Sequence, residues 1–145
     1  MGARPVEVRE GMSGVILTIG TGHTLREAAR RMTEKGVGAA VVLDEEQPAP
    51  GLISERDILN SLGRGQDPDA ELVGAHMSDS MIVAAPDWSL ERAAMEMAHR
   101  HIRHLVVVER GEMVGILSMR DIVRVWTSEG ATSGMEPPES EQTPA

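Results

Sequence analysis

Hydrophobic residues in this chain form two kinds of pattern, helical stripes and short continuous runs. Over residues 25–32 they recur at i, i+3, i+4 and i+7, the spacing of one buried helix face. Thr24 comes directly before this stripe and Glu27 lies three residues later, which predicts a reciprocal capping box at the start of a helix. Gly36 follows the stripe and predicts that this helix ends at a glycine in the left-handed backbone conformation.

The continuous runs are too short for helices. Residues 39–43 are apolar throughout and lead into a polar turn stretch, so they predict a buried strand. Residues 15–19 predict an earlier strand and residues 51–53 the returning one. A second helix is expected over 54–62, so the order of this unit is β-α-β-β-α.

The same unit occurs twice. A shift of 65 positions superposes Met12-Ser13 on Met77-Ser78, and after a one-residue slip it superposes 51–58 on 115–122. We therefore interpret the chain as a duplication. The second copy predicts its elements in the same order, with strands at 81–84, 105–108 and 113–117 and helices at 89–100 and 119–127.

The two units define the domain organisation. We expect a first motif over 6–62, a polar connector over 63–75, a second motif over 76–127 and a disordered acidic tail over 128–145. A unit of roughly 50 residues buries too little surface to be stable alone. The motifs are therefore predicted to pack sheet to sheet about a pseudo-two-fold axis, in a mixed α/β (α+β) fold.

The repeat order, the Met-Ser openings and the paired Gly-x-x-Ser-x-x-Asp segments at 51–57 and 115–121 resemble a tandem pair of cystathionine-β-synthase (CBS) motifs, a Bateman module. The resemblance covers residues 6–127. It implies a free-standing regulatory protein that binds an adenine nucleotide such as AMP or ATP, or a related adenosyl ligand, and signals to an unidentified client protein. It also implies a homodimer formed through helix surfaces, for which the candidate residues here are Met95, Val123, Val125 and Trp126.

Ser54 and Asp57 are predicted to lie in the first turn of a helix that follows a strand. Free backbone N–H groups and the helix dipole favour an anion there, and a carboxylate can accept hydrogen bonds from ribose hydroxyls. The resemblance implies nucleotide binding by these two residues and by Ser118 and Asp121. Ser-x-x-Asp is also an ordinary helix-capping pattern, so a purely structural role stays open.

The segment 99–104 contains three histidines and two arginines. His101 and His104 have the i, i+3 spacing of a metal pair, but no nearby carboxylate or thiolate completes a site, and we expect no metal. A helix C-terminus that favours cations is a second interpretation. The resemblance implies a third, in which Arg103 and His104 recognise phosphate.

Several further positions predict that the two nucleotide clefts differ. The resemblance implies ligand contact for Thr18, whose counterpart Val83 cannot form a hydrogen bond. The repeat equivalents of Arg103 and His104 are Gly38 and Ala39, so the Asp57 site is expected to be the stronger one. Arg56 and Arg120 lie between the Ser and Asp of each motif, where they either reach phosphate or remain solvated.

Composition narrows the possible partners. With 23 acidic and 14 basic residues the net charge is −9, which disfavours general binding to nucleic acids and to anionic membranes. The absence of cysteine excludes thiolate chemistry, and no apolar run is long enough to span a bilayer. We expect a cytoplasmic protein without a cofactor.

Two other functions compete with nucleotide sensing. One is a ligand-free homodimerising scaffold whose caps serve stability alone. The other is a small hydrolase that would use Asp57, Asp121 and His104. The sequence offers no convincing pair of nucleophile and base for it, so we expect no enzyme activity.

Overall fold

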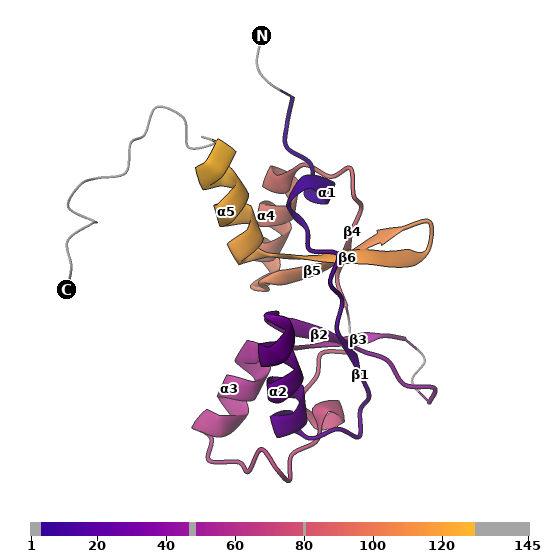
Figure 1. Ribbon diagram of the computed structural model, residues 1–145, viewed down its shortest axis with the longest axis vertical. Coiled ribbons are helices and arrows are strands. Elements are labelled where there is room, and N and C mark those ends of the chain that lie inside the picture. The colour runs from indigo at the N-terminus through magenta and orange to yellow at the C-terminus, as the bar shows by residue number, and fades with distance from the viewer. Residues whose placement is uncertain (1–3, 47–48, 80, 130–145) are drawn as a thin grey trace, which may run out of the picture.

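The computed structural model describes residues 4–46, 49–79 and 81–129, and its two motifs have the predicted β-α-β-β-α order (Figure 1). The first motif contains β1 (Thr18–Ile19), α2 (Leu25–Lys35), β2 (Ala39–Val42), β3 (Gly51–Ser54) and α3 (Glu55–Gly63). The second contains β4 (Val83–Ala84), α4 (Leu90–Arg100), β5 (His104–Glu109), β6 (Glu112–Ser118) and α5 (Met119–Glu129). A short helix, α1 (Val8–Gly11), lies before β1, and a 3₁₀ turn, Val73–Ala75, lies before β4.

Each motif forms a three-stranded sheet with the same topology. The first strand pairs in parallel with the second, and the second pairs antiparallel with the third, in the orders β1-β2-β3 and β4-β5-β6. The sheets meet through buried Val41, Val106 and Ile116. The helix pairs of both motifs lie on the same side of the molecule (Figure 1). The mixed α/β fold of two stacked motifs is therefore confirmed.

Local sequence signals explain most element boundaries. Gly36 ends α2 with a φ of 69°, as the stripe predicts. The predicted capping box is wrong in its second half: the Thr24 hydroxyl accepts the Glu27 N–H at 3.1 Å, but the Glu27 carboxylate accepts bonds from Arg30 and Arg31. The Glu27 carboxylate thus forms its charge-assisted hydrogen bonds with two guanidinium groups and not with the Thr24 N–H.

Some predicted boundaries move because pairing partners decide them. The first strand is two residues long and does not extend over 15–19, since its parallel ladder pairs only Thr18 with Val41 and Ile19 with Val42. Helix α5 continues through Glu129, past the predicted start of the tail. The rest of that predicted tail, residues 130–145, lies outside the described residues. Within the described part of the chain, no helix is long and apolar enough to cross a membrane.

The chain segments that open the two motifs are exchanged. Val8, which lies before β1 in the opening segment of the first motif, is completely buried in the core of the second. Val73, which precedes the second motif, is completely buried in the core of the first. Ser13 likewise pairs with Ile116 of β6, and Ser78 pairs with Leu52 of β3. Each motif is thus completed by residues that the repeat assigns to the other.

This exchange brings backbone against β3 and β6 at a glycine in each strand. A Cβ placed on Gly51 would lie 2.6 Å from the Ser78 carbonyl oxygen, and one on Gly115 would lie 2.7 Å from the Ser13 carbonyl oxygen. Real Cβ atoms do not approach backbone so closely. These glycines, which open the Gly-x-x-Ser-x-x-Asp segments, are therefore required by packing.

Replacing Gly51 by alanine is expected to destabilise the protein by about 1–3 kcal/mol, the usual cost of forced overpacking. Chemical denaturation measures the free energy of unfolding. Gly22→Ala is the matched control, because a Cβ at Gly22 meets nothing within 4 Å. Equal stability of the two variants would mean that the Ser78 backbone is not held against β3.

The helix residues proposed for a dimer surface differ in their exposure. Met95 and Val123 are 71% and 51% exposed. Val125 is buried in the second core and Trp126 packs partly buried against it, so their prediction as open surface is wrong. Both lie on the inner side of α5, where a stripe of apolar residues faces the sheet. The exposed apolar side chains Leu59 and Leu62 on α3 were not among the predicted residues.

Candidate functional site

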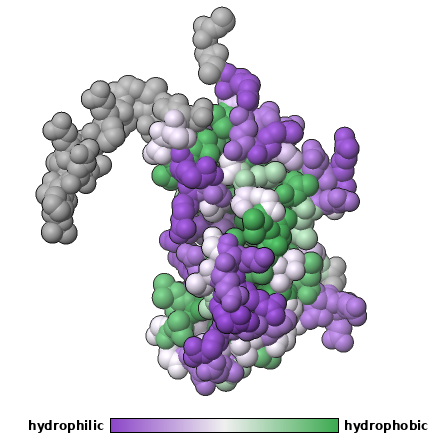
Figure 2. Space-filling view, viewed as in Figure 1, coloured by the Kyte–Doolittle hydropathy of each residue, from purple (hydrophilic) through white to green (hydrophobic). Residues whose placement is uncertain are grey.

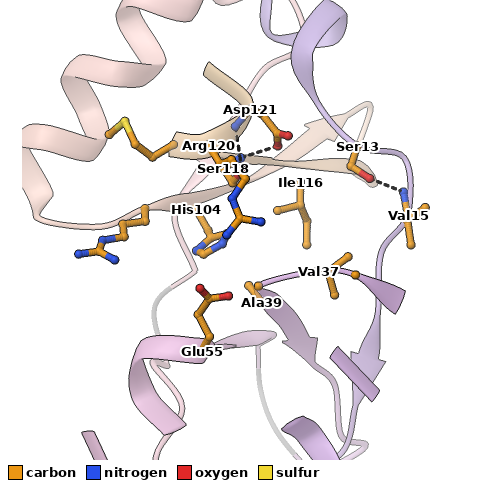
Figure 3. A pocket seen from close by; sticks show the side chains of 14 residues that line it. Ser13, Val15, Val37, Ala39, Glu55, His104, Ile116, Ser118, Arg120 and Asp121 are labelled. Carbon is orange, nitrogen blue, oxygen red and sulfur yellow. Dashed lines mark hydrogen bonds between the residues drawn. The ribbon is translucent and has the colours of Figure 1, made fainter. Parts of the chain in front are cut away.

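The two predicted aspartates lie in different cavities between the motifs. The Asp57 cleft has a volume of about 320 Å³ and the Asp121 cleft, seen in Figure 3, about 470 Å³. Both volumes suit a small organic ligand. Ser54, Arg56 and Asp57 line the first cleft, and Ser118, Arg120 and Asp121 line the second.

The predicted capping role of each Ser-Asp pair is present. The Asp57 carboxylate accepts the Ser54 N–H at 2.8 Å, and the Ser54 hydroxyl accepts the Asp57 N–H at 3.3 Å. The corresponding distances for Ser118 and Asp121 are 2.9 and 3.0 Å. One carboxylate oxygen of each aspartate is therefore engaged in the cap.

The second carboxylate oxygen distinguishes the two sites. Asp121 Oδ1 lies 3.5 Å from the Arg124 guanidinium, which donates more closely, at 3.1 Å, to the Gly11 carbonyl. Among the described residues, Asp57 Oδ1 has no hydrogen-bond donor. Asp57 is thus the aspartate with an oxygen available to accept hydrogen bonds from a ligand.

The backbone at each helix start leaves one donor unused. The Glu55 N–H donates to the Gly38 carbonyl at 2.9 Å, and the Met119 N–H donates to the Arg103 carbonyl at 2.8 Å. The third amide of each helix donates to the capping serine. In the described structure the second amide of each helix, that of Arg56 or Arg120, has no hydrogen-bond partner. Each cleft is therefore lined by a residue whose free helix N–H favours binding of an anion.

Arg103 and His104 line both clefts, whereas the repeat predicts them for the Asp57 cleft alone. The reason is their position at the start of β5, between the two helix starts: His104 is paired in register with Ser118. Gly38 and Ala39 line only the Asp121 cleft, where they provide no charge.

Thr18 lines neither cleft, so its predicted place in the Asp57 cleft is wrong. Its side chain lies on the exposed face of β1. The exchange of opening segments is the physical reason, because it places Val15 in the Asp121 cleft and Ile82 in the Asp57 cleft.

Glu55 is a cleft residue that sequence reasoning missed. It lines both clefts, and Figure 3 shows its carboxylate directed from the first motif toward His104 of the second. A Cβ on Gly38 would lie 2.5 Å from Glu55 Oε2 and 3.3 Å from His104 Nε2, so both side chains use the space that this glycine leaves. Comparison of the two repeats could have identified it, because the residue equivalent to Glu55 in the second motif is Met119, which carries no charge.

Burial lowers the pKa of His104 below its ordinary value of 6.5. Glu55 and Asp121 act to raise this pKa, and Arg103 and Arg120 act to lower it further. The lowered pKa favours the neutral, hydrogen-bonding form of His104.

The lowered pKa predicts an acid-sensitive contribution to stability. The unfolded chain protonates His104 at a higher pH than the folded chain does, so stability is lost as the pH falls below about 6.5. His104→Gln is expected to reduce the fall in the free energy of unfolding between about pH 7.5 and pH 5.5. Denaturant titrations at the two pH values measure it, and identical losses for both proteins would contradict the prediction.

The metal interpretation of the histidine segment has no geometric support in the described residues. His101 ends α4 in a left-handed conformation with a φ of 58°, so it does not share a helix face with His104. Across residues 4–46, 49–79 and 81–129, no three His, Asp or Glu side chains converge as metal ligands.

The CBS domain family model matches residues 6–64 and again 71–128. The CBS domain-containing protein YhcV of Bacillus subtilis is 32% identical over 130 residues, which are 88% of this chain and 91% of that protein. An uncharacterized protein of Methanopyrus kandleri is 32% identical over 124 residues, 84% of this chain but only 63% of the relative. The structure of a CBS domain protein from Pyrobaculum aerophilum complexed with AMP is also similar, with a TM-score of 0.72 and 32% identity, covering 88% of this chain and 100% of that one.

Proposed function

Because the chain belongs to the CBS domain family and contains two CBS domains, we propose that it is a regulatory module that binds an adenine nucleotide, or a related adenosyl ligand, between them. Ligand occupancy is then passed to a client protein. A ligand shifts a conformational equilibrium only through its different affinities for the two states. The clefts suit this role because each is built from both motifs.

The observation that carries this proposal is the set of groups in the Asp57 cleft. The free Arg56 amide and the Arg103 guanidinium are donors suited to a phosphate, whereas the Ser54 hydroxyl already donates to the Asp57 carboxylate at 3.0 Å. Asp57 has one oxygen available for ribose hydroxyls. A nucleoside phosphate needs both kinds of group at a short separation. The similar Pyrobaculum protein complexed with AMP supports the same ligand class.

Asp57 marks the cleft that we propose to be the stronger. Its cleft also contains His101 and Asn60, whereas the Asp121 cleft has Gly38 and Ala39 instead. The contact of Arg124 with Asp121 further reduces the accepting capacity of that carboxylate.

Thermal unfolding with and without millimolar ligand tests the proposal. AMP, ATP, NAD and S-adenosylmethionine are the probes, and GMP is the control for a phosphate effect without adenine. A ligand that binds only the folded state raises the free energy of unfolding, by about 2.7 kcal/mol at 100 times its Kd, and so raises the melting temperature. No shift with any adenosyl compound would favour the ligand-free scaffold.

We also propose that the chain forms a homodimer through its helices. Leu59, Leu62, Met95 and Val123 are exposed apolar side chains on α3, α4 and α5, all on the helix side of the molecule. Figure 2 shows hydrophobic surface over α3 at the edge of that side. Such apolar area on a small domain favours association.

Light scattering at micromolar concentration is expected to give the mass of a dimer, and the double variant Leu59→Glu, Met95→Glu is expected to give a monomer. Buried charges without partners would make the interface unfavourable. Val83→Glu, an exposed apolar position on β4 outside the helices, is the matched control and should leave the dimer intact. A monomer mass for the unmodified chain would refute the proposal.

A further inference from the structure

The two clefts share their central side chains. Arg103, His104 and Glu55 line both cavities, while each cleft has one arginine of its own, Arg56 or Arg120. A symmetric duplication would give each cleft its own basic pair. Here the counterparts of Arg103 and His104 are Gly38 and Ala39, so Arg103, the residue before β5, has to serve two sites.

The sharing of Arg103 affects the charge balance of both clefts. Counting the histidines as neutral, the Asp57 cleft has Arg56 and Arg103 against Asp57 and Glu55. The Asp121 cleft has the same balance, with Arg120 and Asp121 beside the shared pair. Each cleft is neutral only while Arg103 is counted in it. When Arg103 engages a phosphate on one side, the other cleft has one arginine against two carboxylates.

Glu55 adds to the negative charge of the cleft that remains empty. Its carboxylate lies beside Gly38 and His104 at the boundary of the clefts, and the residue is exposed. A phosphate bound in one cleft repels this carboxylate toward the other. The second cleft then becomes more negative as it loses its shared cation.

We infer that the two clefts are mutually exclusive for phosphorylated ligands: one nucleotide binds per chain, and Arg103 and Glu55 together exclude a second. This inference rests on the proposed function and concerns its stoichiometry. The exclusion is electrostatic, so a nucleoside without phosphate does not experience it. Arg103 and Glu55 are thus residues that determine specificity by ligand charge.

Isothermal titration calorimetry of the full chain with AMP and with adenosine tests the inference. AMP is expected to bind the unmodified protein at one per chain. Arg103→Ala should weaken this event about tenfold or more, because it removes a charge-assisted bond to phosphate. The same variant should leave adenosine affinity unchanged. Glu55→Gln should admit a second AMP, and Glu91→Gln, a first-turn glutamate of α4 outside both clefts, should not.

The outcomes separate the inference from the proposed function. Two AMP molecules per chain with similar affinities, or AMP affinity unaffected by Arg103→Ala, would overturn the inference and leave the proposed function standing. A Glu55→Gln protein that still takes one AMP would also overturn it. Absence of binding by AMP, adenosine and the other adenosyl compounds would remove both. Arg103 and Glu55 are exposed, and circular dichroism verifies that the variants fold.

Discussion

Deletion of residues 1–12 is expected to destabilise the second motif, although this segment leads into β1 of the first motif. Val8 is completely buried in the second core. Its N–H donates to the Trp88 carbonyl at 2.8 Å, and the Leu90 N–H donates to the Val6 carbonyl at 2.9 Å. Burial of a valine contributes about 1.5–3 kcal/mol and each hydrogen bond about 0.5–1.5 kcal/mol. The expected loss in the free energy of unfolding is therefore about 3 kcal/mol or more.

Tryptophan fluorescence can measure this loss in the second motif specifically. Trp88 and Trp126 are the only tryptophans of the chain, and both pack against the second core. Val8→Ala should shift the urea midpoint in the same direction as the deletion. Val83→Ala is the matched control, because Val83 is 45% exposed in the same motif. An unchanged fluorescence midpoint in the deletion variant would show that α1 does not complete the second core.

Asp57→Ala is expected to weaken nucleotide binding in the Asp57 cleft about 100-fold or more. The carboxylate can accept two charge-assisted hydrogen bonds from ribose hydroxyls, each worth about 1.5–3 kcal/mol, and a factor of ten corresponds to about 1.4 kcal/mol. The same substitution removes half of the α3 capping box, which costs about 1 kcal/mol of stability. Calorimetry below the melting midpoint therefore measures affinity on folded protein.

Two further variants separate capping from ligand binding. Asp57→Asn retains an oxygen that can accept the Ser54 N–H but loses the negative charge, so it should preserve stability while still weakening the ligand. Asp121→Ala alters the cap of α5 in the same way and should leave nucleotide binding in the Asp57 cleft unchanged. If Asp121→Ala abolished all binding while Asp57→Ala left it intact, the assignment of the stronger cleft would be reversed.

Local interactions explain how much of this protein could be predicted from the amino-acid sequence. The stripe over residues 25–32, the serine caps and the left-handed Gly36 each depend on residues within one helical turn. The duplication is visible because its copies retain the same local signals, Gly51 to Asp57 and Gly115 to Asp121. The elements, their order, the mixed α/β fold and the family therefore follow from the sequence alone.

Contacts between distant segments were decided by the tertiary structure. Val8 begins the short helix α1 and Val73 begins a 3₁₀ turn. The residues next to them in the sequence do not indicate that Val8 packs in the second core or Val73 in the first. The same exchange keeps Thr18 out of the clefts and brings Val15 and Ile82 into them. The sharing of Arg103 and Glu55 is likewise invisible along the chain, because it depends on two helix starts and one strand meeting in space. Sequence periodicity specifies which face of an element is buried, whereas the partner of that face depends on packing of the whole chain.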